Sequence, residues 1–184
     1  DLRDRPAQGF DDALARLARA GARIERGRFP DLTEAMGLTA ILFTAEAYGI
    51  WGPTIETAPD KMFPRIRERF RSGAGFKAAD YVAAWRRLRV IRAAWAQAMA
   101  GYDAVLVPTS PILPPNADRL MNDHDYYVSE NLLSLRNTRI GNLMGLCALT
   151  LPTAQPSCGL SLMAAPMQED RLLRLGMAAE RALA

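Results

Sequence analysis

The sequence is poor in the residues that hold metals or drive acid–base chemistry. Its 184 residues include two cysteines, Cys147 and Cys158, and one histidine, His124. A structural zinc site needs four closely spaced ligands, which these three side chains do not supply. His124 lies between two aspartates, and we interpret it as a solvated residue of a polar loop rather than a catalytic base. We therefore predict no metal ligands, no cofactor and two unpaired, buried thiols.

Long hydrophobic runs and phosphate-binding motifs are also missing. The most apolar stretch, residues 35–51, is interrupted by glycine, threonine and glutamate, and it falls short of the ~18 uninterrupted apolar residues that span a bilayer. No G-x-x-x-x-G-K, G-x-G-x-x-G or G-x-S-x-G segment occurs. These absences argue against a membrane protein, a nucleotide-binding loop and an α/β-hydrolase nucleophile elbow.

Excess charge is small as well. There are 23 basic and 20 acidic side chains, which gives a formal net charge of +3. That excess produces too weak a field to indicate nucleic-acid binding. The arginines of residues 86–92 are best explained as the solvated face of a helix, and we expect no nucleic-acid partner.

What the sequence does contain is ordinary globular composition, with 49% apolar residues. The length suits one domain or part of a larger one. Because the chain begins with Asp1 instead of methionine, we expect it to be processed or excised from something longer. Apolar periodicity and breaker residues predict helices over residues 10–20, 32–48, 60–71, 79–100, 130–146 and 168–183. Short apolar runs predict strands over residues 22–25, 104–107, 147–152 and 159–164.

Alternation of helices with short apolar strands predicts an α/β fold. Helix 79–100 carries the clearest apolar stripe. Ser129 is expected to cap helix 130–146, and residues 116–127 are expected to form a polar surface excursion. Three or four doubly buried strands would leave apolar sheet edges exposed, so we expect partner strands from outside this chain.

Four segments, in order, resemble the amidase signature family. Residues 102–111 (YDAVLVPTSP) are similar to its D-x-L-x-x-P-T-x-P strand and loop. Residues 136–152 (RNTRIGNLMGLCALTLP) are similar to its N-T-x-x-x-N-L-x-G-x-P-A-x-x-L-P helix and strand. Residues 158–163 (CGLSLM) resemble its G-L-Q-L-I-G strand, and residues 169–175 resemble its final helix. Cys147 replaces the usual proline, Ser161 replaces a frequent glutamine, and the connection between Pro152 and Cys158 is shorter than usual.

The resemblance implies a layered α/β/α domain with a mixed β-sheet core, of which residues 1–184 would be the C-terminal portion. Residues 1–100 would be mostly helical, and residues 101–184 would supply strands and helices of the core. Family members use a serine nucleophile, a second serine on a cis peptide and a lysine. No Gly/Ser-rich stretch occurs here, and neither Lys61 nor Lys77 has the matching context. We therefore expect no catalytic residue in this chain and the missing N-terminal half as its partner.

The resemblance also implies which residues approach the substrate. We expect Thr109, Arg136, Thr138 and Asn142 to bind substrate or to support the catalytic loop, with structural roles for Thr138 and Asn142 as the alternative. Thr44, Tyr48 and Trp51 are better explained by core packing than by pocket lining.

The function implied is hydrolysis of a small-molecule linear amide by serine acyl transfer, in a cytoplasmic enzyme for which a homodimer is left open. Two alternatives stand beside it. One is the A component of a glutamyl- or aspartyl-tRNA amidotransferase, and the other is a non-catalytic interaction domain of degenerate amidase fold. The presence or absence of the serine–serine–lysine set upstream would discriminate between enzyme and scaffold.

Overall fold

A computed structural model describes residues 1–27 and 32–184. Pro30 and Asp31, which precede predicted helix 32–48, lie outside the described residues. The chain divides into two compact units, one of Asp1–Arg28 with Ala98–Ala184 and one of Phe29–Gln97. All three described strands belong to the first unit, and the predicted α/β class is confirmed.

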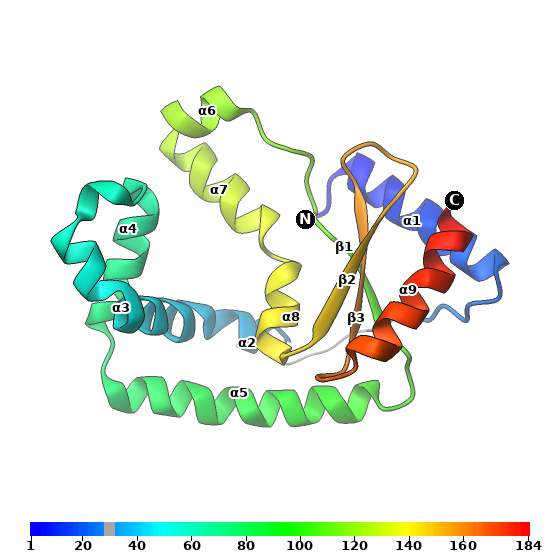
Figure 1. The fold of residues 1–184 in the computed structure, drawn as a ribbon, viewed down its shortest axis with the longest axis horizontal. Helices are drawn as coiled ribbons and strands as arrows, with labels where there is room; N and C mark the ends of the chain where they lie inside the picture. Colours follow the sequence, from blue (N-terminus) through cyan, green and yellow to red (C-terminus); the bar gives the residue numbers. More distant parts are fainter. Residues whose placement is uncertain (28–31) are drawn as a thin grey trace. The chain divides into compact units, whose positions relative to one another are not determined.

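The first unit is built on a small antiparallel sheet. Its strands are β1 (Val105–Pro108), β2 (Cys147–Pro152) and β3 (Gly159–Ala164), in the order β1-β3-β2 (Figure 1). These are three of the four predicted strands. Only the central strand β3 is largely buried, whereas the edge strands β1 and β2 are about half-buried. Because these three strands pair antiparallel, the parallel pairs of the mixed sheet that the resemblance implies would involve other strands.

One face of the sheet carries the apolar core of this unit. Helices α1 (Asp4–Arg19) and α9 (Glu169–Leu183) lie against that face and against each other (Figure 1). Leu160 and Leu162 of β3 meet Leu17 of α1 and Leu172 of α9, all at most 6% exposed. Alternation along a strand sends every second side chain to this face, so the intervening residues point to the other face.

The opposite face is partly covered by α8 (Thr138–Met144). Met163 of β3 is 2% exposed, and a Cβ on Gly141 of α8 would lie 3.9 Å from its Sδ. The same face carries Thr150 and Ser161, which pair across β2 and β3. This face is therefore apolar at the start of β2 and hydroxyl-rich at its end.

The described residues of the second unit form helices joined by short connections, with no strand among them. It contains α2 (Leu32–Gly37), α3 (Thr39–Thr57), α4 (Pro64–Arg71) and most of α5 (Ala78–Met99), with short 3-10 turns at Pro59–Lys61 (η1) and Ser72–Gly75 (η2). The predicted stripe of α5 is confirmed, because Leu88, Ile91 and Trp95 are buried. Burial of one face of a long amphipathic helix supplies most of its stability.

Three predictions in the N-terminal half differ from the structure. Residues 22–25 form no strand, although Ile24 still packs against the core of the first unit. Helix 32–48 is divided at Leu38 and then continues past Pro53 to Thr57. Proline lacks the N–H that would bond to the preceding turn, but backbone hydrogen bonding resumes after it, where the Ala58 N–H donates to the Thr54 carbonyl at 3.0 Å. Predicted helix 60–71 is η1 followed by α4.

Two predictions in the C-terminal half are also wrong, namely a single helix over residues 130–146 and Ser129 as its cap. The polar excursion 116–127 contains α6 (Ala117–Asn122) and the start of α7 (His124–Ser134), and helix 130–146 is α7 followed by the separate α8. Ser129 lies inside α7, whose N-cap is Asp123, with its carboxylate accepting from the Tyr126 N–H at 2.9 Å. His124 is exposed as predicted, but at a helix start rather than in a loop.

The thiols lie at opposite ends of the β2–β3 hairpin. Cys147 pairs with Ala164, whereas Cys158 precedes Gly159, which pairs with Pro152. At ~3.3 Å per residue, the hairpin holds them too far apart for a disulfide. Both are free, as predicted, and both are half-buried. Among the described residues, no helix is both long and apolar enough to cross a bilayer.

Candidate functional site

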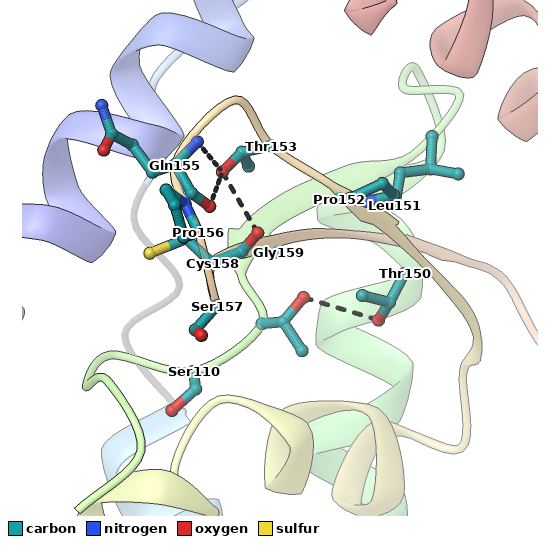
Figure 2. Close-up of a pocket in the computed structure, with 11 residues that line it drawn as sticks. Ser110, Thr150, Leu151, Pro152, Thr153, Gln155, Pro156, Ser157, Cys158 and Gly159 are labelled. Carbon is teal, nitrogen blue, oxygen red and sulfur yellow. Dashed lines mark hydrogen bonds between the residues drawn. The ribbon is translucent and has the colours of Figure 1, made fainter.

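A hollow opens at one end of the sheet, where β1 and β2 finish and β3 begins. Its volume is about 460 Å³, and Figure 2 shows the side chains that line it. The lining residues come from the segments next to the strand ends: Thr109, Ser110, Thr150, Leu151, Pro152, Thr153, Gln155, Pro156, Ser157, Cys158 and Gly159. None of these lining side chains carries a formal charge at neutral pH. The hollow therefore suits an uncharged polar ligand group better than an ion.

Three hydroxyl groups meet at the inner wall of the hollow. The Ser161 Oγ lies 2.7 Å from the Thr109 Oγ1 and 2.9 Å from the Thr150 Oγ1. Thr109 and Thr150 are 3.4 Å apart, which is long for a hydrogen bond between hydroxyls. Ser161 is 4% exposed and lies behind the other two. The sequence analysis selected Thr109 but missed this cluster. The local signal for the cluster is that each of the three hydroxyl residues lies within three residues of a strand end.

The turn between β2 and β3 forms a second wall. Its backbone closes through hydrogen bonds from the Thr153 N–H to the Cys158 carbonyl at 3.0 Å and from the Cys158 N–H to the Gln155 carbonyl at 3.2 Å. The Thr153 hydroxyl also donates to the Cys158 carbonyl, and Figure 2 shows these side chains folded around the turn. Burial raises the pKa of the Cys158 thiol. This thiol is therefore protonated at neutral pH and a poor nucleophile.

Hydrogen bonds hold the loop that follows β1 at both of its ends. The Thr109 N–H donates to the Gly159 carbonyl at 2.8 Å, and the Asn137 Nδ2 donates to the Pro108 carbonyl at 2.7 Å. Further along, the Arg3 N–H donates to the Pro111 carbonyl at 3.0 Å, and the Arg3 guanidinium forms an ion pair with Glu130, which is 3% exposed. The wall that carries Thr109 is thus held by three separate segments.

No metal centre is formed by the described parts of the chain. Within residues 1–27 and 32–184, no three His, Cys, Asp or Glu side chains gather closely enough to hold an ion. The chemistry available at the hollow is hydrogen bonding by hydroxyls, backbone groups and one amide side chain.

A comparison with known protein families shows the family to which this chain belongs. The family model described as Amidase matches residues 2–173. This chain belongs to the amidase family.

Individual relatives in the amidase family are distant and considerably longer. The 2-amino-5-chloromuconic acid deaminase of Comamonas testosteroni is 30% identical over 181 residues, which cover 95% of this chain and 39% of that protein. The rice (Oryza sativa) fatty acid amide hydrolase is 28% identical over 190 residues, which cover 98% of this chain and 31% of that protein. The A component of the Desulforamulus reducens glutamyl-tRNA(Gln) amidotransferase is 27% identical over 92% of this chain and 40% of that protein. This chain thus spans between about three and four tenths of the length of these relatives.

Solved structures confirm the amidase fold. The structure of Kluyveromyces lactis allophanate hydrolase superposes with a TM-score of 0.85 at 20% identity, over 98% of this chain and 30% of that one. The similarity at this identity concerns the fold alone.

Within this amidase fold, the predicted site residues are only partly brought together. Thr109 lines the hollow, whereas Arg136, Thr138 and Asn142 are not among its lining residues. Thr138 and Asn142 are exposed one turn apart on α8, and the Thr138 hydroxyl donates to the Leu135 carbonyl at 3.1 Å. Asn137 connects the two places, because it bonds to Pro108 directly before Thr109. Sequence reasoning named the two neighbours of Asn137 but missed Asn137 itself.

The three residues for which core packing was expected instead of pocket lining, Thr44, Tyr48 and Trp51, lie in the second unit. Thr44 is half-buried, and its backbone carbonyl would lie 1.9 Å from a Cβ at Gly73. Tyr48 is half-buried with its ring against Gly52. Trp51 is 50% exposed, so the core packing expected for it is wrong.

Proposed function

We propose that this chain forms part of an amide-bond hydrolase that works by serine acyl transfer. Membership of the amidase family, through a match that spans residues 2–173, is the observation that carries this proposal. In such a reaction the serine oxygen adds to the amide carbonyl, the amine leaves with a proton, and water then releases the acid from the ester. The substrate class we propose is a small linear amide.

The catalytic groups of this enzyme would lie outside residues 1–184, and this portion alone would be inactive. We assign to it the sheet, its apolar core and part of the substrate pocket within the C-terminal portion of one larger domain. The edge strands β1 and β2 support this role, because they leave backbone groups for further strands to pair with. The partner of this portion would then be the N-terminal half of the same domain.

The substrate pocket would include Thr109 at the hollow, and Arg136, Thr138 and Asn142 on or next to α8. Support for this grouping comes from the 2.7 Å hydrogen bond between Asn137 and Pro108, which joins the start of α8 to the loop after β1. We propose a cytoplasmic enzyme without a nucleic-acid or membrane partner.

Hydrolysis by the complete polypeptide that contains residues 1–184 tests the proposal. A panel of aliphatic and aromatic primary amides is incubated with the protein, and ammonia release is measured. We expect release from at least one amide and its loss after treatment with a serine-directed fluorophosphonate. No release from any amide, with a folded protein, would contradict the proposal and favour the non-catalytic interaction domain.

The A component of a tRNA-dependent amidotransferase is the second candidate. It is favoured by the relative from Desulforamulus reducens, whose name carries that function. This candidate predicts glutamine hydrolysis that rises when the other components of the complex and charged tRNA are added. An amidase that acts by itself would hydrolyse its amide without either addition.

A further inference from the structure

The three hydroxyls behind the hollow form a hydrogen-bonded ring with one weak side. Thr109, Ser161 and Thr150 point to the same face of the sheet, and Ser161 makes the two short contacts, of 2.7 and 2.9 Å. The third side, between Thr109 and Thr150, measures 3.4 Å. Thr109 and Thr150 line the hollow, whereas Ser161 does not. The weak side of the ring is therefore the one that borders the hollow.

Proton counting fixes what this side offers to a ligand. A serine hydroxyl carries a single proton, so Ser161 can donate to one threonine at most; with its proton used inside the ring, it donates to one threonine and accepts from the other. The threonine that donates to Ser161 uses its hydroxyl proton in that bond, so it can only accept hydrogen bonds from a ligand in the hollow. The other threonine keeps its own O–H, which can donate into the hollow. The pair thus presents one donor beside one acceptor.

This arrangement distinguishes between classes of ligand. A carboxylate can only accept, so it would leave the threonine that has used its proton without a partner. An ammonium group can only donate, so it would leave the free threonine O–H without an acceptor. A primary carboxamide carries a carbonyl acceptor next to an N–H donor and matches both threonines at once. It would replace the weak contact between Thr109 and Thr150 with two hydrogen bonds. The uncharged lining of the hollow favours the same choice, since no lining side chain offers a counter-charge to an ion, and among the described residues the one charge that acts on the lining is that of Arg5 on the Cys158 thiol.

We propose that Thr109 and Thr150 form a subsite for a non-reacting carboxamide of the substrate, and that Ser161 is the residue that positions them. The subsite rests on the proposed amide hydrolase function, because it names a second polar group on the substrate of that enzyme. Ser161 acts through the two threonines and does not touch the ligand.

Three substrates with the same reacting amide test the subsite. Adipamide, adipamate and aminocaproamide end in a carboxamide, a carboxylate and an ammonium group, respectively. The complete protein should show its highest kcat/KM for adipamide, after correction for its two equivalent amides. Ser161→Ala should lower the preference for adipamide over adipamate by roughly three- to tenfold, as expected for the loss of one neutral hydrogen bond.

Matched variants separate positioning from folding. Thr150→Val removes the hydroxyl without changing the size of the side chain and should also lower the preference. Thr150→Ser keeps the hydroxyl and should restore it. Thr33→Val, an exposed change in α2, should leave the preference unchanged. If Ser161→Ala does not fold, the comparison of Thr150→Val with Thr150→Ser decides.

Failure of the subsite is distinguishable from failure of the function. If the amides are hydrolysed but Ser161→Ala and Thr150→Val retain the wild-type preference, the subsite is wrong and the hydrolase stands. If nothing is hydrolysed, binding of adipamide and adipamate to the complete protein is compared by ligand-observed NMR. Tighter binding of adipamide that Ser161→Ala abolishes would support the subsite, and equal binding of the two would overturn it.

Discussion

The side-chain amide of Asn137 donates a hydrogen bond to the carbonyl oxygen of Pro108 at 2.7 Å. This bond ties the start of α8 to the end of β1, two segments separated by 29 residues. Asn137 is 8% exposed, so the Pro108 carbonyl would lose its partner in a place where water does not easily replace it.

Asn137→Ala should therefore destabilise the complete protein by about 1–3 kcal/mol, the cost of a buried acceptor left without a donor. Equilibrium denaturation in urea measures the free energy of unfolding. Asn122→Ala is the matched control, because the Asn122 amide also donates to a backbone carbonyl, at 2.8 Å, but is exposed. The control should stay within about 0.5 kcal/mol of wild type. Equal losses in the free energy of unfolding for both variants would show that the buried bond to Pro108 contributes no more than the exposed bond of Asn122.

Gly73→Ala should destabilise the second unit. A Cβ at Gly73 would lie 1.9 Å from the backbone oxygen of Thr44, and a backbone atom cannot rotate away. We expect a loss at the upper end of about 1–3 kcal/mol, the usual range for overpacking. Gly75→Ala, in the same 3-10 turn, meets nothing within 4 Å and should be tolerated. Comparable melting temperatures for the two variants would refute this account of the contact.

Thr138→Val should change substrate handling more than stability in the complete protein. Thr138 is exposed, and its hydroxyl donates to the Leu135 carbonyl of the preceding turn. A surface change of this kind costs about 0.5 kcal/mol or less, whereas a residue at the substrate pocket should alter KM or kcat several-fold. A large fall in melting temperature with unchanged kinetics would make Thr138 a structural residue.

The Glu56–Arg71 ion pair should give Glu56 a lowered pKa that an acid titration can measure. The Arg71 guanidinium donates to both Glu56 oxygens, at 3.0 and 2.8 Å, and this hydrogen bonding lowers the pKa of Glu56. A carboxyl group with a lowered folded pKa contributes stability that is complete above its ordinary pKa of about 4.3 and is lost as the pH falls through the folded value.

Arg71→Lys removes the two-pronged geometry and should shift the pKa of Glu56 upward, toward its ordinary value. NMR of the Glu56 side-chain carboxyl measures the shift directly. Lys61→Arg, on an exposed side chain of the same unit, should leave that pKa unchanged. An unchanged Glu56 pKa in Arg71→Lys would show that proximity of any cation suffices.

The parts of the fold predicted from the sequence are those determined by local signals. The strands ending at Pro108 and Pro152 carry compact apolar runs, and α5 carries an apolar stripe over six turns. The breaks that sequence reasoning missed depend on distant contacts. No glycine or proline separates α7 from α8, and the chain turns at a point where Asn137 reaches Pro108.

The candidate site shows the same limit. Thr109 could be selected because it stands within a segment that resembles a known family. Its hydrogen bond to Ser161 depends on the register of β1 against β3, and the Thr150–Ser161 contact depends on the register of β2 against β3. A one-residue slip in either pairing would send these side chains to the other face. The position of hydroxyl residues near strand ends was therefore not enough to predict the cluster.

The location of the reactive serine tests the central claim most directly. The complete protein is labelled with a fluorophosphonate and digested, and the modified peptide is identified by mass spectrometry. We predict an adduct on a serine outside residues 1–184 and none on Ser72, Ser110, Ser129, Ser134, Ser157 or Ser161. An adduct on one of these six serines, abolished by its replacement with alanine, would contradict the assignment of this chain as the portion without the nucleophile.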